Sequence, residues 1–307
     1  MIFSYARVLV QAAPAGFAKF DNSVLSSRTG NVSSDLGRKN FELPDFEIFA
    51  FIASIFLSLK CWLTWYGDIA SVNRLRAPVS KRLFLLTAPL VCLVLISIAL
   101  TKPAATTVRS DALYITFYLL LGTGWLGGVT LIFPFSGISA RDDVLERGNR
   151  AASWAVIGAL TGASCSFAGA NVGNGPGVEA VLFSAVLSSA LFIGLWLGMD
   201  LLTSISDAIT VDRDDRAGIR QGGFLLSIGL LSGWSVAGDW VSASATLKDF
   251  ATSSWPAILV TAVAVAVEVV LRRASLQLFA KTIPSVVISA VYVGLALVWV
   301  VIRGVPS

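Results

Sequence analysis

The chain has no histidine and few charged residues. Of its 307 residues, 14% are charged and 55% are hydrophobic, and the mean hydropathy is +0.77. Without histidine, no imidazole is present to act as a general base in a catalytic triad or to bind haem, zinc or copper. The sequence therefore excludes the enzymes and metal sites that depend on this side chain.

Cysteine is scarce as well. Cys61, Cys92 and Cys165 lie in three different apolar stretches and form no C-x-x-C pair, so we expect them to be packing residues rather than zinc ligands or a redox pair. The chain also lacks a phosphate-binding loop, a dinucleotide fingerprint and a segment that interleaves aromatic and basic residues. The glycine-rich residues 169–177 contain no lysine. The sequence thus predicts no cofactor, no metal and no nucleic-acid partner.

Long apolar stretches make up most of the chain. Each is close to the 20 or so residues that a helix needs to cross a bilayer, and each is continuous rather than alternating, which favours helices over a barrel. We predict an all-α integral membrane protein, a polytopic bundle of eight transmembrane helices. The predicted spans are 45–66, 83–100, 112–135, 150–170, 178–205, 217–240, 255–271 and 283–302.

Basic residues predict the orientation of these spans. The loops after the first, third, fifth and seventh spans contain Arg74, Arg76, Lys81, Arg82, Arg141, Arg147, Arg150, Arg213, Arg216, Arg220, Arg272, Arg273 and Lys281. The other loops and the C-terminus contain only Lys102, Arg109, Lys248 and Arg303. Because basic loops stay in the cytosol, we expect both termini to be exoplasmic. Arg38 and Lys39, just before the first span, argue for a cytosolic N-terminus instead, which would require an odd number of spans and would remove 255–271, the shortest one.

The chain divides into four parts. Residues 1–44 are rich in Ser, Asn and Gly and predict a mobile polar tail, although residues 2–13 are compatible with a short interfacial helix. Residues 45–110 hold two transmembrane helices, 111–240 a four-helix core, and 241–307 two more helices.

The core contains a candidate internal repeat. Asn149 and Asp215 each follow a mixed-charge loop and precede an apolar helix, so both are predicted N-caps. Each helix then has two glycines four residues apart, which allow a neighbouring helix to approach closely. These are Gly158 and Gly162 in one helix and Gly229 and Gly233 in the other. Since both helices run in the same direction, the pattern predicts a parallel duplicated helical pair.

Two motifs in this region carry a resemblance to a known family. They are Asn149-Arg150-Ala151-Ala152, followed by Gly158 and Gly162, and Arg216-Ala217-Gly218-Ile219, followed by Gly229. Over roughly residues 111–240 the chain resembles a bacterial inner-membrane family of unknown function, typified by the small four-span YjfL-like proteins. The resemblance implies two tandem copies of a helical pair in the inner membrane, and no established reaction. The second copy departs from the family pattern, because Asp215 replaces Asn and Arg216 replaces the first Ala.

Three of the ionisable residues inside the predicted spans form a candidate intramembrane polar site: Lys60, Asp200 and Glu268. One hypothesis pairs Lys60 with one of the two acids, which would create a site for a cation or a proton. The other treats each residue separately. Lys60 then reaches the headgroups beside Trp62, Trp65 and Tyr66, Glu268 pairs with Arg272, and Asp200 lies at the interface. We favour the second hypothesis, because none of the three residues lies at the predicted midplane.

A second candidate site lies in the predicted exoplasmic loops. It comprises Asn171, Asn174, Glu179 and Asp239. The glycines of residues 171–177 permit either a re-entrant binding loop or an ordinary tight turn, and the abundance of turn residues favours the turn.

These patterns favour a non-catalytic structural or auxiliary component of the bacterial envelope. The alternative is a channel or secondary transporter for a small ion or polar solute. We expect no enzymatic activity, because no combination of acid, base and nucleophile is visible. The expected partners are membrane lipid and either further copies of the chain or other membrane proteins.

Overall fold

The computed structural model describes residues 45–71, 79–101, 108, 111–274 and 282–304. This part of the chain is helical and contains no strand. The long helices are α3 (Asp45–Ser71), α4 (Val79–Thr101), α6 (Ala112–Thr130), α7 (Arg150–Gly169), α8 (Val178–Thr203), α10 (Asp215–Trp234), α12 (Trp255–Ala274) and α13 (Thr282–Arg303). The shorter ones are η1 (Phe133–Ser136), η2 (Ala140–Glu146), α9 (Ile205–Thr210) and α11 (Ala243–Ser253). The predicted tail and its interfacial helix lie outside the described residues.

Six helical stretches among the described residues are long and apolar enough to cross a membrane. They are Phe46–Ser71, Ala112–Thr130, Arg150–Gly169, Val178–Thr203, Ala243–Arg272 and Pro284–Arg303. The described apolar part of α4 is shorter, at Leu85–Thr101, and α10 carries two arginines and a glutamine. The apolar helices fit a multi-pass membrane protein, and all eight predicted spans coincide with helices.

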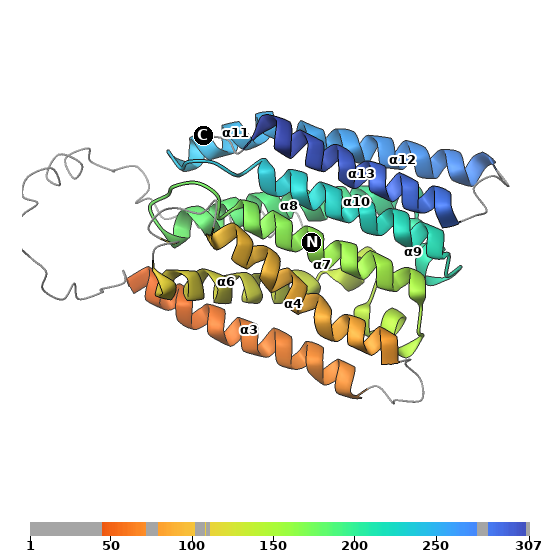
Figure 1. Ribbon diagram of the computed structural model, residues 1–307, viewed down its shortest axis with the longest axis horizontal. Helices are drawn as coiled ribbons and strands as arrows, with labels where there is room; N and C mark the ends of the chain where they lie inside the picture. Colours follow the sequence, from red (N-terminus) through yellow and green to blue (C-terminus); the bar gives the residue numbers. More distant parts are fainter. Residues whose placement is uncertain (1–44, 72–78, 102–107, 109–110, 275–281, 305–307) are drawn as a thin grey trace, which may run out of the picture. The chain divides into compact units, whose positions relative to one another are not determined.

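Helices α7 and α10 lie side by side at the centre of the bundle and run in the same direction (Figure 1). Helices α4 and α6 pack against α7, and α8, α12 and α13 pack against α10. Helix α3 packs mainly on α6. We call the end at which α7 and α10 begin the arginine end, since it carries Arg147, Arg150 and Arg213. The opposite end, with Gly173 and Gly238, is the glycine end.

Local chemistry sets the helix ends and corrects several predicted boundaries. Helix α6 stops at Thr130, short of the predicted residue 135, and the chain continues as η1 with Pro134 near its start and Gly137 at φ 77°. Helix α8 stops at Thr203, because Ser204 adopts a left-handed conformation with φ 46°. The prediction that Asp215 is the N-cap of α10 was wrong. The side chain of Asp214 accepts the hydrogen bond from the N–H of Arg216 and is the cap of α10, and Asp215 is its first residue.

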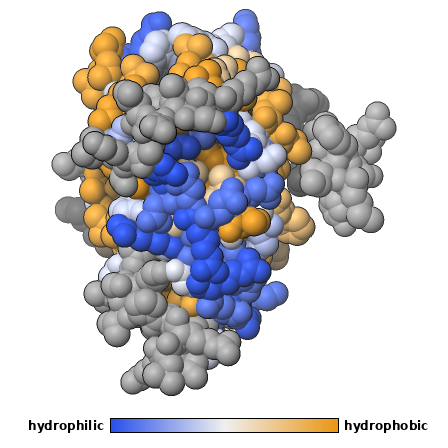
Figure 2. Space-filling model, turned by 90° about the vertical axis from the view of Figure 1, so that its right-hand side faces the viewer, coloured by the Kyte–Doolittle hydropathy of each residue, from blue (hydrophilic) through white to orange (hydrophobic). Residues whose placement is uncertain are grey.

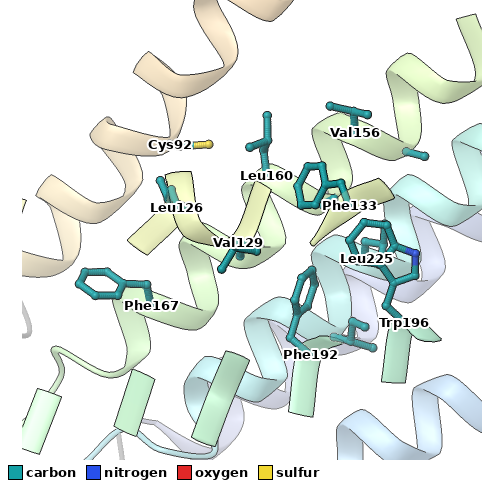
Figure 3. Close-up of a cluster of buried hydrophobic side chains, with 14 of the residues drawn as sticks. Cys92, Leu126, Val129, Phe133, Val156, Leu160, Phe167, Phe192, Trp196 and Leu225 are labelled. Atoms are coloured by element: carbon teal, nitrogen blue, oxygen red, sulfur yellow. The ribbon is translucent and has the colours of Figure 1, made fainter. Parts of the chain in front are cut away.

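Large apolar side chains fill the space between the helices (Figure 3). The ring of Trp196 on α8 lies 5.3 Å from that of Phe133 and 6.0 Å from that of Phe192, in edge-to-face contacts. Cys92 is buried in the same core. By contrast, the residues that face away from the bundle are mostly apolar and exposed. Figure 2 looks onto the arginine end, where hydrophilic residues form a band between apolar sides, as expected when lipid surrounds the helices.

Candidate functional site

The contact between α7 and α10 is made by backbone against backbone. A Cβ atom added at Gly158 would overlap the backbone of Gly222, and one added at Gly229 would overlap that of Gly162. Nearer the glycine end, Gly169 and Gly233 are in the same kind of contact. The four glycines singled out in the sequence therefore lie in this seam. Gly222, which the sequence reasoning missed, lies in the seam too. A Cβ added at Gly222 would lie only 2.6 Å from the backbone oxygen of Trp154.

An ion pair is buried between α10, α12 and α13. The guanidinium of Arg220 makes two hydrogen bonds to the carboxylate of Glu268, through Nε to Oε1 and through Nη2 to Oε2 (2.8 Å), and its Nη1 donates to Ser285 Oγ at 3.0 Å. Arg220 is 8% exposed and Glu268 2% exposed. A bidentate pair is the geometry in which a guanidinium compensates a buried carboxylate best.

This pair corrects three sequence predictions. Glu268 binds neither Lys60 nor Arg272, and Arg220 is not a loop residue but lies inside α10. Arg272 instead donates from Nη2 to the carbonyl of Ser204 at 2.8 Å. Arg220 was missed because it was counted among the basic loop residues, although the predicted span 217–240 already contained it.

Lys60 and Asp200 lie elsewhere. Asp200 Oδ1 accepts a hydrogen bond from the N–H of Ser206 at 2.9 Å and so holds the start of α9 against α8. Lys60 is exposed on α3. The aromatic residues expected beside it turn inward, since Trp62 donates to Thr123 O (3.0 Å) and Trp65 to Leu85 O (3.2 Å). The three predicted residues thus do not form one polar site.

Several buried polar atoms have no hydrogen-bond partner among the described residues. The hydroxyl of Tyr292 on α13 is one, and both amide atoms of Gln221 on α10 are others. Glu47, at the start of α3, is 7% exposed and its Oε2 also lacks a partner, while its Oε1 lies 2.7 Å from the position of a Cβ on Gly177. Such groups are costly in a membrane interior and mark positions where polar chemistry is retained.

The loops at the glycine end bind each other. Asp239 Oδ1 accepts from both the backbone N and the Nδ2 of Asn174, at 2.7 and 3.0 Å. Backbone bonds continue the contact, from Gly238 N to Val172 O and from Trp240 N to Asn174 O. The two other predicted residues differ in role. Asn171 is buried and donates to Phe167 O at 2.8 Å, whereas Glu179 is exposed in the first turn of α8. Two of the four residues are therefore brought together.

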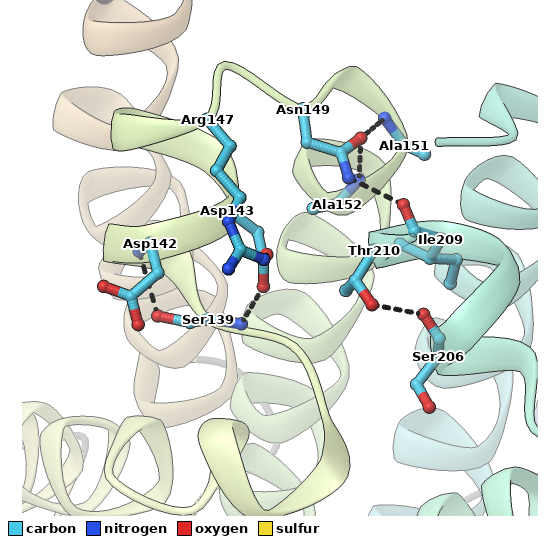
Figure 4. A network of polar contacts seen from close by, with 10 residues as sticks. All are labelled: Ser139, Asp142, Asp143, Arg147, Asn149, Ala151, Ala152, Ser206, Ile209 and Thr210. Carbon is cyan, nitrogen blue, oxygen red and sulfur yellow. Dashed lines mark hydrogen bonds and ion pairs between the residues drawn. The ribbon is translucent and has the colours of Figure 1, made fainter. Parts of the chain in front are cut away.

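A polar network closes the arginine end (Figure 4). Asp143 accepts from Ser139 N at 2.8 Å and from Arg147 Nη1 at 2.9 Å. Asn149, the predicted N-cap of α7, accepts from the N–H groups of the first helical turn, and its Nδ2 donates to Ile209 O at 2.6 Å. A hydrogen bond to the Glu146 carboxylate raises the pKa of Arg141 outside the spans, and Asp68 adds to the effect. Within the described residues, no three acids or cysteines gather as metal ligands.

The segments that lead into α7 and α10 have matching geometry. Both helices are 20 residues long, and both follow a residue with positive φ, Gly148 at 63° and Arg213 at 55°. The N–H of each cap donates to the carbonyl six residues earlier, at 2.8 Å for Asn149 and 2.9 Å for Asp214. The two positive-φ residues are 65 residues apart, and so are the two caps. Asn174 and Asp239, which bind each other at the glycine end, have the same separation.

The chain was compared with known proteins. No curated protein and no solved structure matches it. A family model does match, over the part of the chain that contains α6 to α10 and the glycine seam. The matching model is DUF350, a Domain of Unknown Function, and the match covers residues 106–236.

Proposed function

We propose that this chain is an eight-span protein of the bacterial inner membrane with a non-catalytic structural or auxiliary role in the envelope. Helices α4 and α10 complete the count of eight, because each runs beside helices that are long enough to span. The polar residues of α10 do not argue against a span, since Arg220 and Gln221 are buried against other helices. With the arginine end in the cytosol, both termini are exoplasmic.

The observation that carries this proposal is the closed seam between α7 and α10. It runs from Gly218 against Ala151 to Gly233 against Gly169, which is nearly the whole length of both helices. Backbones in contact leave no space for a solute, and opening the seam would cost all of its packing at once. A rigid centre suits a scaffold that holds other membrane components.

The proposal includes a duplication. The constant separation of 65 residues between the caps, the positive-φ residues and the paired loops favours two tandem copies, one from α6 to α7 and one from α8 to α10. With Asp214 as the cap, the repeat is in register, whereas a cap at Asp215 would have shifted it by one residue. A YjfL-like core of two copies accounts for this pattern.

A transporter is the second candidate, and one observation favours it. The ion pair of Arg220 and Glu268 lies inside the bundle, close to Tyr292, whose hydroxyl has no hydrogen-bond partner among the described residues. Charges inside a membrane often mark ion or proton pathways. This group lies beside α13 rather than in the central seam.

Proteoliposomes separate the two candidates. The purified chain should give no flux of protons, Na⁺, K⁺ or polyamines above that of empty vesicles, and it should co-purify with a stable membrane partner after mild solubilisation. Flux that is abolished by Glu268→Gln and kept by Asp200→Asn would contradict the scaffold function and support the transporter function.

A further inference from the structure

Helix α3 has one packed face and one open face. On the packed face, Ser58 Oγ lies 2.6 Å from Thr123 Oγ1, and Trp62 donates to the same turn of α6. On the open face, Phe49, Phe56 and Leu63 follow one another at intervals of seven residues and are 68%, 70% and 70% exposed. Seven-residue spacing keeps side chains on one side of a helix and is the pattern that helix partners use.

A single charge interrupts this open face. Lys60 is exposed, and it stands one turn from both Phe56 and Leu63. Its ammonium group has no hydrogen bond or ion pair with any residue that the structure describes. We call Phe49, Phe56, Lys60 and Leu63 the outer face of α3.

The depth of Lys60 makes escape to the headgroups costly. Asp68, which pairs with Arg141 at 3.1 Å, marks the polar boundary at the arginine end, and Lys60 lies eight residues before it, about 12 Å along the helix. The start of the apolar run at Phe46 is farther still, about 21 Å away. Moreover, the Cα–Cβ bond of a helical residue tilts toward the N-terminus, which here directs the stem of Lys60 away from the nearer boundary. A charge at this depth calls for a counter-charge within the membrane.

A second copy of the chain is a poor source of that counter-charge. All copies have the same orientation in a membrane, so a two-fold contact through α3 would place the two Lys60 residues at equal depth. Like charges at close range in a medium of low dielectric repel strongly.

We propose that the outer face of α3 binds a membrane-spanning helix of a different protein, and that this helix carries an Asp or Glu at the depth of Lys60. The proposal rests on the auxiliary role argued above and names the chemistry of the partner. Apolar side chains supply the packing, and the lysine selects the partner and fixes its depth, as a polar residue does in other helix pairs.

Site-specific photocrosslinking in native membranes tests this. The full-length chain carries benzoylphenylalanine in place of Phe56, and a matched control carries it in place of Val291, which is 50% exposed on α13. We expect a heterologous adduct at position 56 only. Lys60→Met should reduce it about tenfold, the factor that corresponds to one interhelical polar contact, and Lys60→Arg should retain it. The crosslinked peptide should contain an acidic residue in an apolar span. Lys60→Glu should abolish the adduct, and changing that acidic residue of the partner to Lys should restore it.

Three results would overturn the proposal. They are an adduct of twice the chain's mass, an adduct unchanged by Lys60→Met, and adducts with lipid alone, which would mean that the amine does reach the headgroups. If a partner co-purifies but crosslinks only from other faces, the auxiliary role stands and this docking site does not. Equal thermal unfolding of the Lys60 variants excludes misfolding as the cause.

Discussion

Helices α7 and α10 share a backbone design but hold their neighbours by different means. At the position of Arg220 on α10, the matched position on α7 is the fully buried Ala155. Helix α4 packs against α7, and its Cys92 is fully buried in the apolar core. Helix α12 instead brings a carboxylate to α10, and α13 a hydroxyl.

The features that α7 and α10 share differ in kind from the contacts that each helix makes with its other neighbours. The glycine seam and the caps need only small residues and short polar side chains, so they can occur twice. A buried ion pair needs a particular partner, because removing either member leaves a charge that nothing compensates. The ion pair therefore attaches the hairpin of α12 and α13 in one specific register.

Breaking the ion pair should have the largest effect. Arg220→Met leaves Glu268 buried without a counter-charge and should lower the free energy of unfolding by about 3–5 kcal/mol. The double variant Arg220→Met/Glu268→Leu should lose much less, since no charge is stranded. Thermal unfolding in detergent, with all variants in one detergent, measures both. Equal losses in the single and double variants would mean that packing rather than charge holds α12.

Adding a methyl group inside the seam between α7 and α10 should have the second-largest effect on stability. Gly158→Ala places a Cβ against the backbone of Gly222, which cannot move aside, and should cost about 1–3 kcal/mol. The matched control is Gly194→Ala on α8, where nothing lies within 4 Å of the added atom. The control should be neutral or slightly stabilising. If both variants unfold alike, the two helices are not in contact as described.

The two caps should differ in a predictable order. Asn149→Ala removes the cap of α7 and also the hydrogen bond to Ile209 O, so its cost should approach about 2 kcal/mol. Asp214→Ala removes the cap of α10 together with the partly exposed ion pair to Arg216 Nε (2.8 Å), and should cost about 1 kcal/mol. Asp215→Ala serves as the control and should change stability least. A larger loss for Asp215 than for Asp214 would restore the sequence-based assignment of the cap.

The smallest effect is expected at the glycine end. Asp239→Ala removes two hydrogen bonds to the exposed Asn174 but leaves the backbone bonds between the loops, so the global loss should stay below about 1 kcal/mol. Hydrogen exchange at residues 172–174 should rise locally. Protection that is unchanged there would show that the backbone contacts suffice to hold the loops.

Sequence reasoning succeeded where a property depends on neighbours along the chain. The eight helices were placed well, because length and hydropathy are local, and Asn149 was recognised as a cap from its position before an apolar run. It failed at Asp214 and Asp215, where two equivalent side chains compete and the backbone conformation of Arg213, at φ 55°, decides which one caps the helix.

The sequence by itself determined that this chain folds as apolar helices suited to lipid, with close-packing glycines in α7 and α10, since both follow from spacing and composition. Only the tertiary structure decided the partners of the charges. Glu268 meets Arg220 rather than Lys60 or Arg272, and Lys60 is left on the open face of α3. The physical reason is that a charge pairs with whatever the rotation and register of neighbouring helices bring to it, and packing across the whole bundle sets that geometry.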